Sequence, residues 1–189
     1  QACVSEFPKT GPLMPPLSRM GHVAVSGMTR YRSTEFGAGY RGNLFTTLFN
    51  THKLVRSVVV RDGATFRTTE SDFLVSDDPD FHPTDVLEDA DGSLLVVDTG
   101  GWYKLCCPTS QIAKPEVLGG IYRIRRTNGK LVKDPRGLKL AWAKMSPTQT
   151  AALLDDPRPY IRHRAMAQLG KHGRTAIGTL KRVLAKNKS

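Results

Sequence analysis

Three observations predict a mostly β chain that ends in a short helical segment. Residues 81–126 contain three short strand-like runs, DVLEDADG, SLLVVD and GGIYRIRR. RGNLFTTLFN at 41–50 aligns with DGSLLVVDTG at 91–100, so part of this pattern repeats after about 50 residues. From residue 146 onward the apolar residues follow helical spacing instead. Strand repeats of this length are typical of β-propeller blades, so the predicted fold is a partial β-propeller followed by helices.

The repeat places Gly42 over Gly92, Leu44 over Leu94 and Phe45 over Leu95. KLVRSVVVRDG at 53–63 then takes the place of GGIYRIRRTNG at 119–129. Closed propellers commonly have about four to eight blades. Because two blades do not close a ring, we expect the chain to be part of a larger protein.

The first blade reads as an extended approach followed by four strands. Residues 1–20 are proline-rich, and GHVAVSGMTRYRS at 21–33 is the first expected strand. LFTTLFN, KLVRSVVVR and ATFRTTESDFLVS follow as three more, with Arg61-Asp62-Gly63 as a hairpin turn. In the second blade, Asp91-Gly92 closes the first hairpin.

Helices are expected after a linker that contains Pro135 and Pro147. We place the blades in residues 1–140 and the helices in 141–189. Ser146 or Thr148 caps the first helix, and Asp156-Pro157 interrupts it. PYIRHRAMAQLGKHG and RTAIGTLKRVLAK are the next two, and in the second of these Ile177, Leu180 and Leu184 are expected on one face. Paired short helices of this kind resemble the start of a HEAT-type array.

Charge separates the two parts of the chain. Residues 1–113 hold 10 Lys+Arg and 13 Asp+Glu, whereas residues 114–189 hold 18 and 4. A basic face attracts nucleic acid, anionic lipid or an acidic partner. No recognised nucleic-acid reader motif is present, so nucleic acid is not the expected partner. No apolar run reaches the length of about 18 residues that a transmembrane helix needs.

The three cysteines do not form a disulfide framework, because Cys106 and Cys107 are adjacent and the count is odd. Two alternatives remain open. Either cysteine could pair with Cys3, or both could be semi-buried thiols. Two acidic clusters, at 77–80 and 88–91, are similar in composition to calcium loops, but neither has the twelve-residue EF-hand pattern. We therefore assign no metal site.

Residues 20–126 carry a family resemblance. GHVAVSGMTRY, YRGNLFTTLFN and HPTDVLEDADGSLLVVDTGG occur in the order seen in the multidomain "membrane-bound dehydrogenase" proteins of planctomycetes. Those proteins resemble the soluble pyrroloquinoline-quinone glucose and sorbosone dehydrogenases. In them, HEAT-like helices and a c-type cytochrome domain follow the propeller. One difference is Phe49-Asn50-Thr51-His52-Lys53, which stands where sugar dehydrogenases commonly have His-Gly-Ser-Trp-Asn-Arg.

The resemblance implies a function for the intact parent protein. It would be a sugar or alcohol dehydrogenase that uses pyrroloquinoline quinone and calcium and passes electrons to its cytochrome domain or another acceptor. A periplasmic or secreted location is implied as well. The chain alone would be inactive, since the family's catalytic histidine lies in an earlier blade. The alternative is a non-catalytic propeller and HEAT module that binds carbohydrate or a protein.

Ligands of propellers bind where loops of several blades converge, so candidate residues are sought in loops. His82 and Asp85 would orient a hydroxyl or a proton, or form local hydrogen bonds. Arg41 and Lys53 would meet an anionic cofactor, or be ordinary surface charges. Trp102 would stack on a sugar or quinone ring, or pack between blades. The further candidates in these loops are His52, Asp98 and Thr99.

Overall fold

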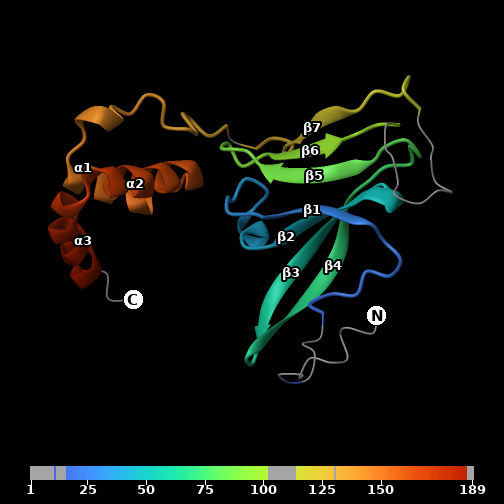
Figure 1. Cartoon of the computed structure of the whole chain (residues 1–189), viewed down its shortest axis with the longest axis horizontal. Helices are drawn as coiled ribbons and strands as arrows, with labels where there is room; N and C mark the ends of the chain where they lie inside the picture. Colours follow the sequence, from blue (N-terminus) through green and yellow to red (C-terminus); the bar gives the residue numbers. More distant parts are fainter. Residues whose placement is uncertain (1–10, 12–15, 102–113, 130, 187–189) are drawn as a thin grey trace, which may run out of the picture.

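The computed structural model describes residues 11, 16–101, 114–129 and 131–186, which form two antiparallel β-sheets followed by helices (Figure 1). Sheet A has the strand order β1 (Val25–Arg30), β2 (Leu44–Leu48), β3 (Lys53–Asp62) and β4 (Thr65–Val75). Sheet B has the order β5 (Pro83–Glu88), β6 (Leu94–Asp98) and β7 (Gly120–Ile124). All seven strands form where the sequence pattern predicts strands.

The glycines that defined the repeat occupy matching backbone positions. Gly42 precedes β2 with a φ of 87°, and Gly92 precedes β6 with a φ of 84°. Both values lie in the left-handed region that side chains disfavour. The expected hairpin at Gly63 is also present between β3 and β4, again with a positive φ. The repeat of the sequence is therefore a repeat of the backbone.

The main core lies between the two sheets, where β5 contacts β1 and β2. Sheet A contributes large side chains to this core, and sheet B contributes smaller aliphatic ones. The buried members are Tyr31, Phe45 and Leu54 from sheet A and its flanking loops, with Phe81, Val86, Leu94 and Val96 from sheet B and its approach. β1 and β5 approach so closely at Gly27 that a Cβ atom there would overlap the backbone of Asp85.

Two ends of the stacked sheets are distinguished by their connections. At the loop end lie residues 49–52 between β2 and β3, residues 76–82 between β4 and β5, and residues 99–101 and 114–119 next to β6 and β7. At the turn end lie residues 31–43 and 89–93. In Figure 1 the loop end is on the right and the turn end faces the helices.

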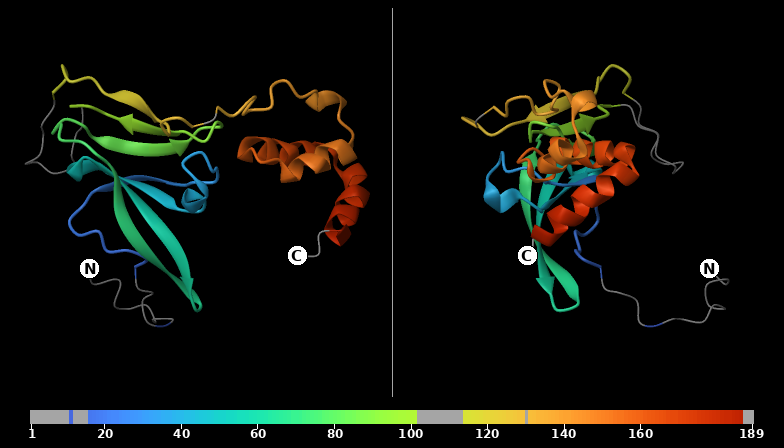
Figure 2. Two further views of the ribbon diagram at one scale, coloured as in Figure 1. Left: turned by 180° about the vertical axis from the view of Figure 1, so that it is seen from behind. Right: turned by 90° about the vertical axis from the view of Figure 1, so that its left-hand side faces the viewer.

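The helical segment lies beside the sheets and not over them (Figure 2). It contains α1 (Pro147–Ala152), α2 (Pro159–His172) and α3 (Arg174–Lys186). Of the two expected caps, Ser146 is the one used: its hydroxyl accepts the N–H of Gln149, whose side chain accepts the N–H of Ser146. Gly173, with a φ of 56°, separates α2 from α3.

The three residues expected on one face of α3 differ in burial. Ala176 and Thr179 are its buried residues, whereas Ile177 and Leu184 are 49% and 73% exposed. The reason is steric, because the small Ala176 packs in a cluster with Ala151 and Leu169 and so brings α3 close to α1 and α2. Leu180 is partly buried against this cluster as expected.

None of the helices in the described ranges combines the length and the hydropathy that a bilayer span requires.

Candidate functional site

The loop end brings together two of the candidate residues that lie 30 positions apart in the sequence, His52 and His82. Their ring centroids are 5.4 Å apart, and the rings meet edge to face. Phe49 from the same turn as His52 lies 4.6 Å from the His82 ring. Two connections that belong to different sheets therefore contribute imidazoles to one cluster.

His52 is held by an unusual backbone conformation. It follows the 3₁₀ turn Phe49–Thr51 and has a φ of 53°, a value uncommon for a residue other than glycine. Its Nδ1 lies 2.6 Å from the carbonyl oxygen of Phe81. Because a carbonyl only accepts hydrogen bonds, Nδ1 carries the proton in the neutral ring and Nε2 is the basic nitrogen.

His82 is 5% exposed and is fixed through both its backbone and its ring. Its Nδ1 lies 2.9 Å from the carbonyl oxygen of Asp80 and 2.8 Å from that of Gly100, so this nitrogen also carries a proton. Its backbone N–H and that of Gly100 both donate to Oδ1 of Asp98, each at 2.8 Å. The Asp98 carboxylate thus fixes the backbone of both His82 and Gly100.

Lys53 follows His52 directly but takes part in a different environment. Its ammonium lies 2.7 Å from the Asp72 carboxylate on β4. The pair lines a pocket of about 390 Å³ together with Arg19, Glu70, Ser71 and Thr51. The hydroxyl of Thr51 is buried there without a hydrogen-bond partner among the described residues. The two neighbouring candidates therefore belong to two sites.

Arg41 and Asp85 lie away from both sites. Arg41 is exposed at the turn end, and its guanidinium has no ion pair or hydrogen bond within the described part of the chain. Asp85 lies in β5, where its Oδ1 accepts the N–H of Val86. The local hydrogen bond that the sequence left open as an alternative is thus present at Asp85. Trp102, Cys3, Cys106 and Cys107 lie outside the described residues.

Sequence reasoning missed an ion pair that closes the loop end. The Lys114 ammonium lies 2.6 Å from Oδ1 of Asp80, linking the approach to β5 with the approach to β7. No local pattern signals a pair separated by 34 residues. Asp80 stood in the acidic cluster at 77–80, but nothing in the sequence assigned it a cation.

The second acidic cluster lies at the turn end and is engaged by arginines. Asp89 pairs with Arg123 and Arg136, and Asp91 pairs with Arg125. Burial disfavours the charged form of both carboxyls, but hydrogen bonds and the guanidinium groups outweigh it, so the pKa of each lies below its ordinary value. Across the ranges the structure describes, no group of three or more His, Cys, Asp or Glu could hold a metal ion.

No curated protein and no solved structure matches the chain. The model of one family, described as a domain of unknown function (DUF7133), matches residues 13–128, which contain both sheets and the loop end. The chain therefore belongs to the DUF7133 family.

Proposed function

We propose that sheets A and B are consecutive blades of a β-propeller. The observation that supports this proposal is that the strands of the two sheets pair in the same register at equivalent positions. Met28 pairs with Thr46 as Val86 pairs with Val96, and Leu44 pairs with Ser57 as Leu94 pairs with Ile124. In a translational repeat, residues at equivalent positions face the same direction.

The equivalent residues of the two sheets differ in burial most clearly at Val86 and Met28. In sheet B, Val86, Leu94 and Val96 are at most 1% exposed because they face sheet A, and Ile124 packs beside them. Their equivalents in sheet A line a groove of about 450 Å³ on its other face, together with residues 17–25: Met28, Leu44, Thr46 and Ser57. Thr46 and Ser57 are buried in this groove, at 4% and 3% exposed. Met28 is 61% exposed. A preceding blade would cover this groove as sheet A covers sheet B.

On this basis, and on the resemblance of residues 20–126, the parent protein is proposed to be a quinoprotein-like sugar or alcohol dehydrogenase. It would bind pyrroloquinoline quinone and calcium and pass electrons to a cytochrome c domain elsewhere in the parent, in a periplasmic or secreted location. The His52–His82 cluster supports this proposal, because it lies where loops of two blades converge. A basic Nε2 at this position suits proton transfer from a substrate hydroxyl.

The test is calorimetric titration of the full-length protein with pyrroloquinoline quinone, with and without Ca²⁺. Saturable, calcium-dependent binding is expected, together with sugar-dependent reduction of an artificial electron acceptor. His52→Ala should weaken binding or turnover about tenfold, while His22→Ala, at an exposed histidine of the same end, should change neither. Absence of both binding and turnover would contradict the proposal.

One observation favours a second candidate, a non-catalytic module that binds carbohydrate. The Lys53 pocket combines charges of both signs with the hydroxyl-bearing residues Ser71 and Thr51. Such groups exchange hydrogen bonds readily with a polyol. Glycan-array binding by the full-length protein that Lys53→Met abolishes, without quinone binding, would establish this candidate.

A further inference from the structure

The last part of the chain carries positive charge without internal compensation. Residues 157–189 contain 9 Lys+Arg and no Asp or Glu. Within 157–186, only the Arg158 guanidinium has a carboxylate partner, Asp156. The guanidiniums of Arg162 and Arg164 reach backbone carbonyls instead. An acid-free surface of this kind favours a negatively charged partner.

On α3 this charge is interleaved with exposed apolar residues. Arg174, Ile177, Lys181 and Leu184 follow one another at helical spacing on one side of the helix. All four are exposed. The opposite side is already packed, with Ala176 and Thr179 buried. Internal packing therefore does not account for Ile177 and Leu184, and Figures 1 and 2 show α3 at the far end of the molecule from the sheets.

Gly178 lies between these residues, near the middle of α3. Glycine is unfavourable in a helix interior compared with alanine. A Cβ atom at Gly178 would meet nothing within 4 Å, so packing inside the chain does not require glycine there. Gly178 and the exposed Ala185 leave a shallow surface, which lets a second helix approach closely.

We propose that the exposed side of α3, formed by Arg174, Ile177, Gly178, Lys181 and Leu184, binds an acidic amphipathic helix of a partner protein. The partner's carboxylates would meet Arg174 and Lys181, and its apolar residues would cover Ile177 and Leu184. Nucleic acid would satisfy the cations but leave the two apolar side chains in water. An anionic bilayer would cover them but would not need the gap at Gly178. The inference does not depend on what the sheets bind.

The test uses a fluorescent peptide of about 18 residues, built of Leu and Glu in helical spacing, and the full-length protein. Anisotropy should show saturable binding. Ile177→Ser with Leu184→Ser should weaken it at least tenfold, because the apolar contact is lost. Arg174→Glu with Lys181→Glu should abolish it, and should create binding to the matching peptide in which Lys replaces Glu.

Two glycine variants form a matched pair. Gly178→Ala and Gly170→Ala each replace an exposed helical glycine whose Cβ position is open, so each should raise Tm by about 2–4 °C. Only Gly178→Ala should weaken peptide binding, because Gly170 lies on α2. If no helix packs on this side of α3, the two variants should bind the peptide equally tightly.

The proposal is overturned if the acidic peptide does not bind, or if the serine variants bind it as tightly as the unchanged chain. It is also overturned if the charge exchange fails to transfer binding to the basic peptide. Vesicles of phosphatidylglycerol and a short DNA duplex serve as competitors. If either binds more tightly than the peptide and the binding requires the same residues, the surface is a lipid or nucleic-acid site instead.

Discussion

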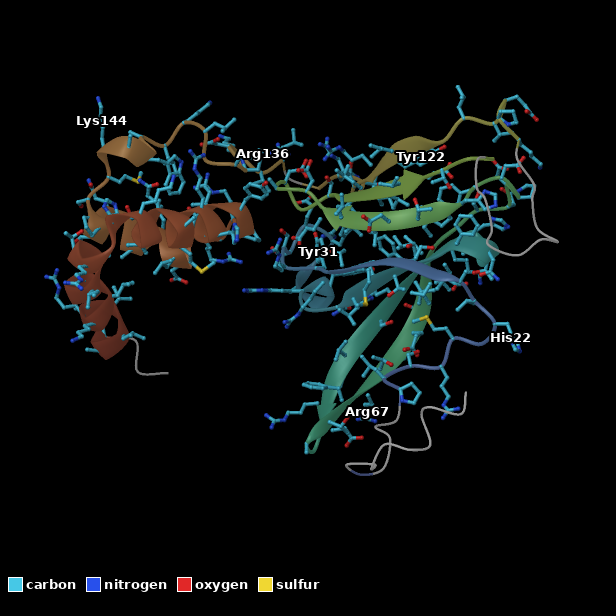
Figure 3. All side chains as sticks on the ribbon, in the orientation of Figure 1. His22, Tyr31, Arg67, Tyr122, Arg136 and Lys144 are labelled. Atoms are coloured by element: carbon cyan, nitrogen blue, oxygen red, sulfur yellow. The ribbon has the colours of Figure 1, made fainter. Side chains whose placement is uncertain are left out.

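Tyr31 joins the two sheets through one buried hydroxyl. The residue is fully buried at the turn end, and its hydroxyl donates to the carbonyl oxygen of Gly92 at 2.7 Å (Figure 3). The backbone N–H of Phe36 donates to the hydroxyl oxygen of Tyr31. Burial raises the pKa of the phenol, so the hydroxyl keeps the proton that it donates.

Tyr31→Phe should therefore lower the free energy of unfolding by about 1–3 kcal/mol, because a buried carbonyl loses its donor. Urea denaturation measures the effect. Tyr40→Phe is the control, since no hydrogen bond involves its hydroxyl among the described residues. Equal effects of the two variants would show that the Tyr31 hydroxyl does not join the sheets.

At single positions, the sequence located the candidate histidines in loops but did not reveal the partners of the charged residues. His52 and His82 were selected as loop residues, and the fold brings their rings together. Lys53 was selected with His52, but it begins a strand, where successive side chains point to opposite faces. His82 was matched with Asp85, yet its backbone binds Asp98 across the β5–β6 pair. Such partners depend on strand register, which residue spacing alone does not reveal.

Among the elements, the connection between sheet B and the helices is electrostatic. Arg123 on β7 donates to Asp89 and to the Ser93 hydroxyl, and Arg136 on the linker also pairs with Asp89. Figure 3 shows Arg136 where the linker leaves the sheets. The pKa values of Asp89 and Asp91 are lower in the folded chain than in the unfolded chain. Their ionised forms therefore stabilise the fold at pH values above the unfolded pKa near 3.9. This stabilisation is lost as pH falls through the folded pKa values.

Arg123→Gln should lower the free energy of unfolding by about 1 kcal/mol near neutral pH. The difference from the unchanged chain should shrink as pH falls below the ordinary carboxyl value near 3.9 and through the lowered folded pKa values of Asp89 and Asp91. Denaturation curves recorded across this range provide the measurement. Arg126→Gln, at an exposed arginine without a partner in the described residues, should have no comparable effect. A pH-independent loss in Arg123→Gln would contradict the electrostatic account.

The contact between β1 and β5 depends on Gly27. A Cβ atom there would overlap Oδ1 and the Cα atom of Asp85. Gly27→Ala should therefore destabilise the fold by about 2 kcal/mol or more, because β1 and β5 are packed against each other and would have to move apart. Gly39→Ala, where a Cβ meets nothing within 4 Å, should be close to neutral. Thermal unfolding compares the two, and similar Tm values would show that the strands do not approach as described.

Sequence pattern predicted the strands and helices well, because turn glycines and the Ser146 cap mark their ends locally. It did not predict which side of α3 is most buried, because the small residues Ala176 and Thr179 are the buried ones. Ala176 is buried because its size lets helices approach, and Ile177 is exposed beside it. Hydropathy alone does not contain that steric term.

For the whole molecule, the repeat at 50 residues is the feature from which the arrangement follows. It was visible in sequence because Gly42 and Gly92 require the same left-handed conformation. Residues 17–25 line part of the groove on the outer face of sheet A, and the sequence did not reveal this contact because the segment has no repeat. Met28, at 61% exposed, marks the part of this sheet face that these residues leave uncovered.

The most direct test of this account is an experimental structure of the full-length protein. We predict that a further antiparallel sheet packs on the groove lined by Met28, Leu44, Thr46 and Ser57, with its own strands in the order and register of sheet A. The His52–His82 cluster should then open toward the axis of a closed ring of blades. A structure in which this groove faces solvent, or is covered by helices, would contradict the stacking and the propeller together.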